Sequence, residues 1–294
     1  MRRGESEKKG PKNNRRERSY LETERYIAQA CTLKESPGCN DREGAHPLSV
    51  IYEDNHILAL IKPPGILSQA DGSKGTDILS AAGAYLKRKY QKPGNVFVGL
   101  VHRLDRNTGG TMLLAKTSKG AARLSEQLRV KRFRKGYFAV TEGVPTSDSG
   151  FLRHNLQKDQ AQNMVRESRD GKLSVLYYQT VRHTAEHALL FVIPITGRTH
   201  QIRSQFSLIG YPLAGDQKYG GEICGSAHAL ALWSSVIWVK HPVRDRMLLL
   251  QSIPDLHLAP WSVFPAFNRN VFQHFLEQEV PDIFIEAEEN RRLL

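Results

Sequence analysis

Asp105 is the residue whose surroundings most clearly permit chemistry. It follows an apolar, β-branched run at residues 96–101 and precedes a glycine-containing turn, with Arg103 and Arg106 close on either side. A carboxylate at the end of a buried strand is costly to bury unless a cation pairs with it, and a paired carboxylate stays ionised and can act as a nucleophile. From these residues alone, the simpler interpretation is an aspartate that only begins the turn.

A second candidate group begins at residue 197, where the sequence reads GRTHQIR. The period of the apolar residues changes here from two to 3.6, which predicts a helix whose apolar stripe faces the core. His200, Arg203 and Ser207 are spaced three or four residues apart, so they share a face that the stripe leaves free. This face is therefore available for a functional site.

Regular elements must position these two groups. Periodicity and turn residues predict a possible helix at 20–33, strands at 49–52, 56–61, 96–101, 111–116, 137–140, 175–181 and 188–195, helices at 77–88 and from a cap at Ser118, and a late hairpin at 236–239 and 247–250. The strand at 96–101 is expected to be buried and to deliver Asp105 to its end. Residues 1–45 read as a basic arm and linker, and residues 46–294 as one folded domain.

The two groups together resemble a known family. HRLDRNTGG at 102–110 looks like the HRLDxxTSG signature of RluA-type RNA pseudouridine synthases, and GRTHQIR at 197–203 looks like their second block. YED at 52–54 with KPPG at 62–65, and GDQKYG at 215–220, resemble further family segments in the expected order. Four ordered blocks between about residues 50 and 252 make a specific signal. The resemblance implies an α+β fold: a large, mainly antiparallel mixed sheet with flanking helices and a central cleft.

The resemblance also implies a catalytic set. Asp105 aligns with the aspartate that attacks uridine at the sugar or the base, releasing uracil for rotation and reattachment through C5. Arg203 aligns with the cation that pairs with this carboxylate. Tyr137 aligns with a tyrosine that stacks on the base and helps to move the C5 proton. A surface ion pair and a core aromatic are the structural alternatives for Arg203 and Tyr137. No cofactor or metal is implied.

Further residues are assigned to RNA contacts. Arg103 aligns with the arginine that occupies the space of the flipped-out base, although a structural ion pair is its alternative. The basic run with Phe133 interleaved either grips phosphates or forms a solvated turn. The complete set predicted to bind RNA is Arg103, His102, Arg106, Thr108, Arg198, His200, Lys131, Arg132, Arg134 and Lys135.

Two departures from the family pattern leave a rival interpretation open. Gly109-Gly110 stands where Ser-Gly is more usual, which suggests a looser turn, and Ala227 stands where a leucine would help to wall the base pocket. The rival is an RNA-binding or RNA-folding protein that keeps the fold without catalysis. A third, weaker alternative is another base-modifying or hydrolytic enzyme that uses Asp105.

Composition agrees with an RNA partner. The 294 residues carry a net charge of +12, and residues 1–18 contain eight basic and three acidic residues in an arm expected to be disordered. Without a spanning segment or secretory signal we expect a cytoplasmic protein with no membrane partner. Cys31, Cys39 and Cys224 lack metal-type spacing, which predicts free thiols. We expect a monomer that acts on a tRNA or rRNA stem-loop, with tRNA slightly favoured because the arm is too short for an added RNA-binding module.

Overall fold

The computed structural model describes residues 48–72, 77–223, 229–264, 268–280 and 283–284. All of the described residues belong to one compact unit. The possible helix at 20–33, the three cysteines and Ala227 lie outside the described residues. The expectations for the basic arm and linker at 1–45 therefore stay predictions.

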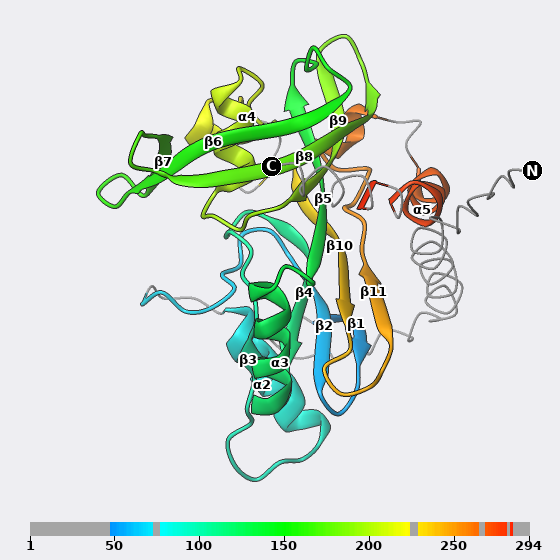
Figure 1. The fold of residues 1–294 in the computed structure, drawn as a ribbon. Helices are drawn as coiled ribbons and strands as arrows, with labels where there is room; N and C mark the ends of the chain where they lie inside the picture. The colour runs from blue at the N-terminus through cyan, green and yellow to red at the C-terminus, as the bar shows by residue number, and fades with distance from the viewer. Residues whose placement is uncertain (1–47, 73–76, 224–228, 265–267, 281–282, 285–294) are drawn as a thin grey trace, which may run out of the picture. The chain divides into compact units, whose positions relative to one another are not determined.

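Within the described residues, eleven strands form one mixed sheet in the order β1-β2-β4-β10-β5-β9-β8-β6-β7, with β11 paired to β10 and β3 paired to β4 (Figure 1). Their bounds are β1 (Ser49–Glu53), β2 (Ile57–Lys62), β3 (Gly99–Leu100), β4 (Gly109–Ala115), β5 (Arg134–Glu142), β6 (Ser149–Asp159), β7 (Met164–Glu167), β8 (Lys172–His183), β9 (His187–Pro194), β10 (Leu232–Lys240) and β11 (Met247–Gln251). Only β4 and β10 run parallel among these described pairs. The α+β, mainly antiparallel fold is confirmed.

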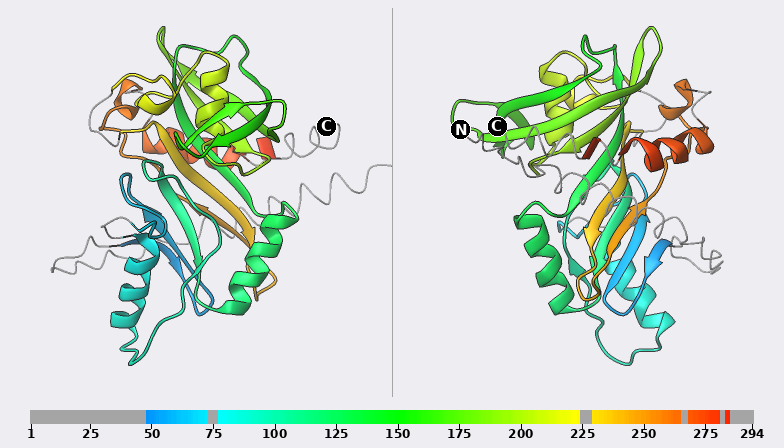
Figure 2. Two further views of the ribbon diagram at one scale, coloured as in Figure 1. Left: turned by 90° about the vertical axis from the view of Figure 1, so that its left-hand side faces the viewer. Right: turned by 45° about the vertical axis from the view of Figure 1, so that its right-hand side comes forward.

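Helices cover both faces of the sheet. They are α2 (Ile78–Lys89), α3 (Ser118–Arg129), α4 (Gln201–Leu208) and α5 (Arg269–Gln278), with short 3₁₀ turns η1 (Gln217–Tyr219) and η2 (Trp261–Val263). In β2, Leu58 and Leu60 pack in the cluster that contains α2, whereas Ile57 and Ala59 pack with α3. Because side chains alternate along a strand, α2 and α3 lie on opposite faces, as Figure 2 shows with the strands between them.

The candidate site lies on the face that holds α2 and α4. One buried cluster joins Leu104, Tyr137 and Ile202, which come from three distant parts of the chain. The opposite face of β5 and β9 carries an aromatic core, in which Phe138 lies 4.8 Å, between ring centroids, from Phe272 of α5. Strand alternation along β5 thus separates Tyr137, which faces the site, from Phe138, which packs beneath the sheet.

The predicted strand at 96–101 is wrong for most of its length. Only Gly99 and Leu100 pair, and they do so with Ala115 and Leu114 at the far end of β4. The same edge of β4 is occupied at its beginning by β10. In this register residues 96–98 would lie opposite residues 116–118, where β4 has ended and α3 begins, and beyond Leu100 the Leu113 N–H is bonded to the His102 side chain. The apolar run therefore has no continuous partner strand, and Asp105 is carried by a turn instead of a strand end.

Most other predicted elements are confirmed with small shifts of their bounds. The cap of α3 is Thr117, whose side chain accepts the Gly120 N–H, and not the predicted Ser118. Strands β6 and β7 and helix α5 were not predicted from the sequence. Strand β6 exposes most of its polar residues, so its apolar period is weak. Among the described helices, none is long and apolar enough to span a membrane.

Candidate active site

A rigid turn presents Asp105. Its backbone is held on one side by Leu104, whose N–H donates to Ser68 Oγ at 3.0 Å while Ser68 Oγ donates to the Leu104 carbonyl at 2.7 Å. On the other side the Thr108 N–H donates to the Asp105 carbonyl at 3.1 Å. The carboxylate side chain itself is 27% exposed. The turn therefore offers an accessible carboxylate on a backbone with little freedom.

Lys62, at the end of β2, binds the backbone of this turn from the protein interior. Its ammonium group is fully buried and donates to the carbonyl oxygens of Pro63, Ile66 and Arg106 at 2.7–3.0 Å. Burial lowers the pKa of Lys62 to about 7, while the negative charge of Asp105 acts in the opposite direction. Lys62 was not among the predicted site residues, although it lies in the KPPG segment.

Arg203 contacts Asp105 and is itself clamped by a second carboxylate. Its Nη1 lies 3.3 Å from Asp105 Oδ2, which is the ion pair expected from the sequence. Its Nε and Nη2 donate to the two carboxylate oxygens of Asp216, both at 2.7 Å. Asp216 is almost fully buried, so this bidentate pair fixes the guanidinium plane from below and leaves one nitrogen for Asp105.

The predicted polar face of α4 meets the segment that contains η1. Arg203 binds Asp216, Ser207 Oγ donates to the Tyr219 carbonyl at 2.7 Å, and His200 Nδ1 lies 2.8 Å from Tyr219 Oη. The other ring nitrogen of His200, Nε2, lies 3.9 Å from Asp105 Oδ2. Asp216 and Tyr219 belong to the GDQKYG block, to which sequence reasoning assigned no role.

Tyr137 lies in the sheet beside this group. It pairs with Ser234 of β10, and Ser234 pairs in turn with Gly110 of β4, so two strand spacings separate Tyr137 from the strand that follows Asp105. Its side chain is 6% exposed and packs in the cluster of Leu104. Tyr137 is thus placed on the floor of the site face.

Two residues predicted to bind RNA are buried instead. His102 Nε2 accepts the Leu113 N–H at 3.0 Å, its ring packs against Phe133, and burial lowers its pKa to about 3. Thr108 is 2% exposed. Neither side chain reaches the surface: His102 is bonded to β4, and the Thr108 hydroxyl is buried without a hydrogen-bond partner among the described residues, so the expected direct contact with RNA is not open to them.

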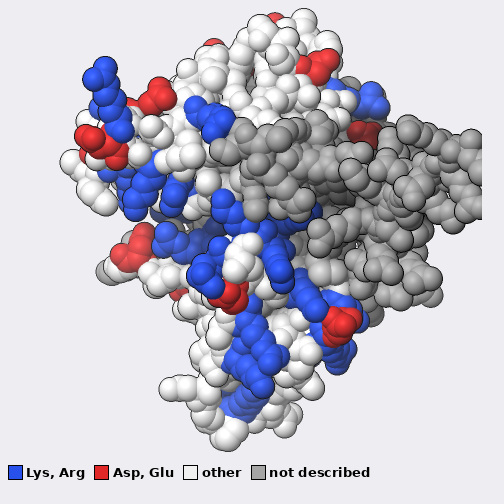
Figure 3. Space-filling model, in the orientation of Figure 1, with Lys and Arg blue, Asp and Glu red and all other residues white. Residues whose placement is uncertain are grey.

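The remaining predicted cations lie near the surface. Arg103, Arg106, Arg198, Lys131 and Arg132 are exposed. Figure 3 shows Lys and Arg side chains gathered across the middle of one face and continuing over α3. A surface of this kind suits a phosphate backbone.

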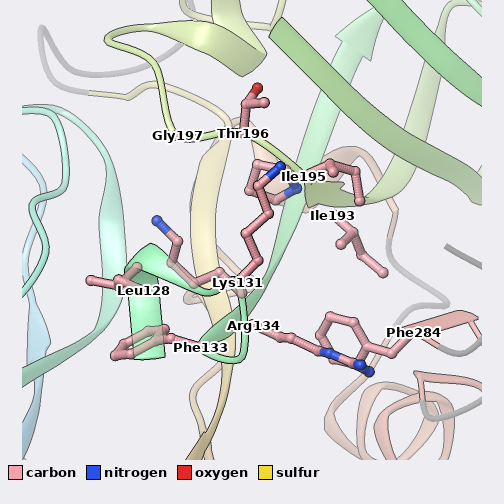
Figure 4. Close-up of a pocket in the computed structure, with 11 residues that line it drawn as sticks. Leu128, Lys131, Phe133, Arg134, Ile193, Ile195, Thr196, Gly197 and Phe284 are labelled. Atoms are coloured by element: carbon pink, nitrogen blue, oxygen red, sulfur yellow. The ribbon is translucent and has the colours of Figure 1, made fainter. Parts of the chain in front are cut away.

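The basic turn, residues 131–135, borders a small pocket of about 90 Å³ (Figure 4). Lys131, Arg134 and Lys135 line one side and residues 193–197 line the other. The Arg134 guanidinium is directed toward Phe284 and lies 5.5 Å from the centroid of Trp238, so it stacks on aromatic rings. Lys135 and Arg134 are half-buried, unlike the exposed Lys131. The pocket connects the basic turn with the start of the GRTHQIR motif.

The two glycines at the turn are required by packing. A Cβ on Gly109 would lie 2.3 Å from the Trp233 ring, and a Cβ on Gly110, whose φ is +115°, would lie 2.3 Å from the Ser234 carbonyl oxygen. Both residues sit in β4 and pair with β10. The expected looseness is therefore wrong here, because the close approach of β10 fills the space that a side chain would take.

Comparison with known proteins agrees with this geometry. Residues 56–208 match the model of the family described as RNA pseudouridylate synthase, a stretch that contains Asp105, Tyr137 and Arg203. Proteins named ribosomal large subunit pseudouridine synthase C are 32% identical over 215 residues in Vibrio cholerae, covering 71% of this chain and 66% of the relative, and 33% identical over 208 residues in Rickettsia typhi, covering 69% and 67%. A namesake from Rickettsia bellii is 35% identical over 59% of this chain and 57% of its own length.

Solved structures show the same fold. Human RNA pseudouridylate synthase domain containing 4 superposes with a TM-score of 0.59 at 21% identity, covering 81% of this chain and 97% of that one. Human RNA pseudouridylate synthase domain containing 1 gives 0.56 at 18% identity, covering 75% and 89%. The chain spans between about half and two thirds of the length of the curated relatives it matches. It belongs to the RNA pseudouridylate synthase family.

Proposed function

We propose that this protein converts uridine in RNA to pseudouridine, with Asp105 as the nucleophile. The observation that carries the proposal is the arrangement of charges around one accessible carboxylate. Arg203 reaches Asp105 at 3.3 Å while Asp216 holds the guanidinium at two points. Such an arrangement holds a nucleophilic carboxylate in one direction.

The reaction that this site would perform is an isomerisation. The bond between N1 of uracil and C1′ of ribose breaks and a bond between C5 and C1′ forms. One proton leaves C5 and one is taken up at N1, so no atom is gained or lost. Asp105 supports the first step by a transient bond to the sugar or the base, and it leaves again when C5 bonds to C1′.

We assign the contact with the detached base to apolar residues beside Asp105. Tyr137 and Leu104 belong to one apolar cluster on the site face, and the Tyr137 ring is a flat surface on which uracil could stack during its rotation. We assign the stacking role to Tyr137 and the opening of the RNA stack to Arg103. Arg103 is exposed and lies two residues before Asp105, so its guanidinium can replace the base that is flipped out.

The proposed substrate is ribosomal RNA of the large subunit. The curated relatives that match most of this chain carry that substrate in their names. This replaces the slight preference for tRNA that the short basic arm suggested, and tRNA becomes the alternative. The exposed cations Arg198, Lys131 and Arg132 are assigned to phosphates beside the target. Lys135, Arg134 and Arg106 are assigned to the edge of the same surface.

The test uses unmodified large-subunit rRNA and tRNA transcripts incubated with wild-type protein and with Asp105→Asn. Pseudouridine is measured by mass spectrometry of the digested RNA. We expect new pseudouridine in rRNA with wild type and none with the variant, while RNA affinity is retained. Asp245→Asn is the matched control, because that carboxylate is 91% exposed in the turn between β10 and β11.

Four results would contradict the proposal in whole or in part. The absence of product from wild type on every RNA would refute the activity. Equal product from Asp105→Asn would refute the role of the carboxylate. Release of free uracil as the final product would indicate hydrolysis instead of isomerisation. Product in tRNA alone would keep the activity and refute the proposed substrate.

A further inference from the structure

His200 has a strained backbone conformation. His200 precedes α4 with φ 49° and ψ 21°, in the left-handed region that residues other than glycine seldom adopt. Its carbonyl accepts the Ser204 N–H at 2.9 Å and the Ser204 hydroxyl at 3.1 Å, so the first turn of the helix holds it there. Strain of this kind is retained where the direction of a side chain matters.

The side chain is directed by Tyr219. The backbone N–H of Val165, in β7, donates to Tyr219 Oη at 2.9 Å. The phenol has one proton, and among the described residues the partner that remains for it is His200 Nδ1 at 2.8 Å. Burial raises the pKa of Tyr219, so the phenol keeps that proton near neutral pH.

These bonds select one form of the imidazole. If Nδ1 accepts from the phenol, the proton of a neutral ring lies on Nε2. Burial lowers the pKa of His200 below its ordinary value, and Arg203 and Lys218 add to this effect while Asp105 and Asp216 oppose it. The ring is therefore neutral near pH 7 and carries an N–H on the nitrogen that lies 3.9 Å from Asp105 Oδ2.

We propose that His200 is a positioning residue for the Asp105 carboxylate, donating its Nε2–H to Oδ2 in a tautomer that Tyr219 fixes. Arg203 already contacts the same oxygen, and once substrate has shortened the His200 contact the two donors would hold Oδ2 and present Oδ1 to the substrate. The present separation exceeds a hydrogen bond, and contacts of this kind shorten when substrate fills the site. This deepens the proposed function and replaces the direct RNA contact expected of His200 from the sequence.

The tautomer can be measured without any reaction. In full-length protein labelled with ¹⁵N in histidine, long-range proton–nitrogen spectra at pH 7 distinguish a protonated from an unprotonated ring nitrogen. We expect an unprotonated Nδ1 and a protonated Nε2 at His200, and a mixture of tautomers in Tyr219→Phe. A ring protonated on Nδ1, or charged at pH 7, would overturn the proposal even if the protein has no activity on the RNAs tried.

Kinetics test the consequence for Asp105. His200→Asn suits the left-handed backbone but removes the ε nitrogen, so we expect the single-turnover rate to fall by about 10- to 100-fold, the size of one hydrogen bond to a charged group. RNA affinity should change less than about threefold. His200→Gln restores an N–H near the ε position and should recover part of the rate. His183→Asn, at the exposed end of β8, is the control.

An RNA contact by His200 would give the opposite pattern. Affinity would then fall in His200→Asn while the rate at saturating RNA stayed unchanged, and this result would overturn the proposal. A full rate in His200→Asn would do the same. Failure of the proposed function is distinguishable, because wild type would then form no pseudouridine while the tautomer at His200 could still be read from the spectra.

Discussion

The substitution Asp216→Asn tests whether Asp216 supports Arg203 structurally while Asp105 is its partner in the proposed reaction. Arg203 binds two carboxylates, but Asp216 is nearly fully buried and bidentate, whereas Asp105 is 27% exposed and contacts a single nitrogen. Asparagine has the same shape and keeps one acceptor, but it removes the charge beside a guanidinium whose side chain is only 9% exposed. Breaking a buried pair from one side costs about 3–5 kcal/mol.

We therefore expect Asp216→Asn to lower the free energy of unfolding by about 3 kcal/mol, the lower end of that range because one neutral acceptor remains. Asp105→Asn should change it by no more than about 1 kcal/mol, since that carboxylate is partly solvated. Urea unfolding followed by tryptophan fluorescence measures both variants against wild type, with the exposed Asp245→Asn as control.

The Asp216→Asn variant should also lose activity. With Asp216 removed, Arg203 loses its fixed plane, and the rate of pseudouridine formation should fall by about 10-fold or more even at a temperature where the variant is folded. The reasoning is refuted if Asp216→Asn loses less than about 1 kcal/mol and keeps the wild-type rate. It is also refuted if Asp105→Asn is the more destabilised of the two.

Three further predictions follow from separate features. The pKa of Lys62 is lowered from 10.5 to about 7 in the folded chain, so between these pH values the unfolded chain binds more protons than the folded chain. The difference in unfolding free energy between wild type and Lys62→Met should therefore rise with pH through this window, by up to about 1.4 kcal/mol per pH unit. A difference that does not change with pH would contradict the lowered pKa of Lys62. Gly110→Ala should lose about 2 kcal/mol or more in thermal or urea unfolding because its added methyl meets the β10 backbone, whereas Gly94→Ala, with nothing within 4 Å, should stay within about 0.5 kcal/mol. Deleting residues 1–18, which carry eight basic residues, should weaken RNA binding and reduce its salt dependence; an unchanged slope of log Kd against log salt would show that the arm makes no phosphate contacts.

Much of the fold was predictable because local patterns and tertiary packing agree. The hairpin of β10 and β11, the pair β1 and β2, and helix α2 behind its Asp77 cap all follow from apolar period and turn residues. The run at 96–101 shows where this fails. Its composition favours a strand, but strand formation needs a partner strand of matching length, and no property of the segment itself states that β4 ends opposite Gly99.

The candidate site, like the fold, was only partly predictable from the sequence. The motifs located Asp105, Arg203 and Tyr137, and the structure brings the first two into contact and places the third in the same apolar cluster as Leu104. Residues that act through others were harder to assign. Lys62 and Asp216 stand in recognisable segments, but their roles depend on their partners in the fold. Lys62 binds the Arg106 carbonyl, 44 residues away, and Asp216 binds the guanidinium of Arg203 in α4.

The sequence by itself determined the family and the basic character of the chain, and it singled out Asp105 as the proposed nucleophile, because each of these depends on residue types and their order. Only the tertiary structure decided which side chains reach solvent and which serve as supports. Burial removed His102 and Thr108 from the expected RNA contacts and made His102 a link between the turn and β4, and the approach of β10 made the two glycines a packing requirement. Such outcomes depend on segments that meet from distant parts of the chain, which spacing along a sequence does not encode.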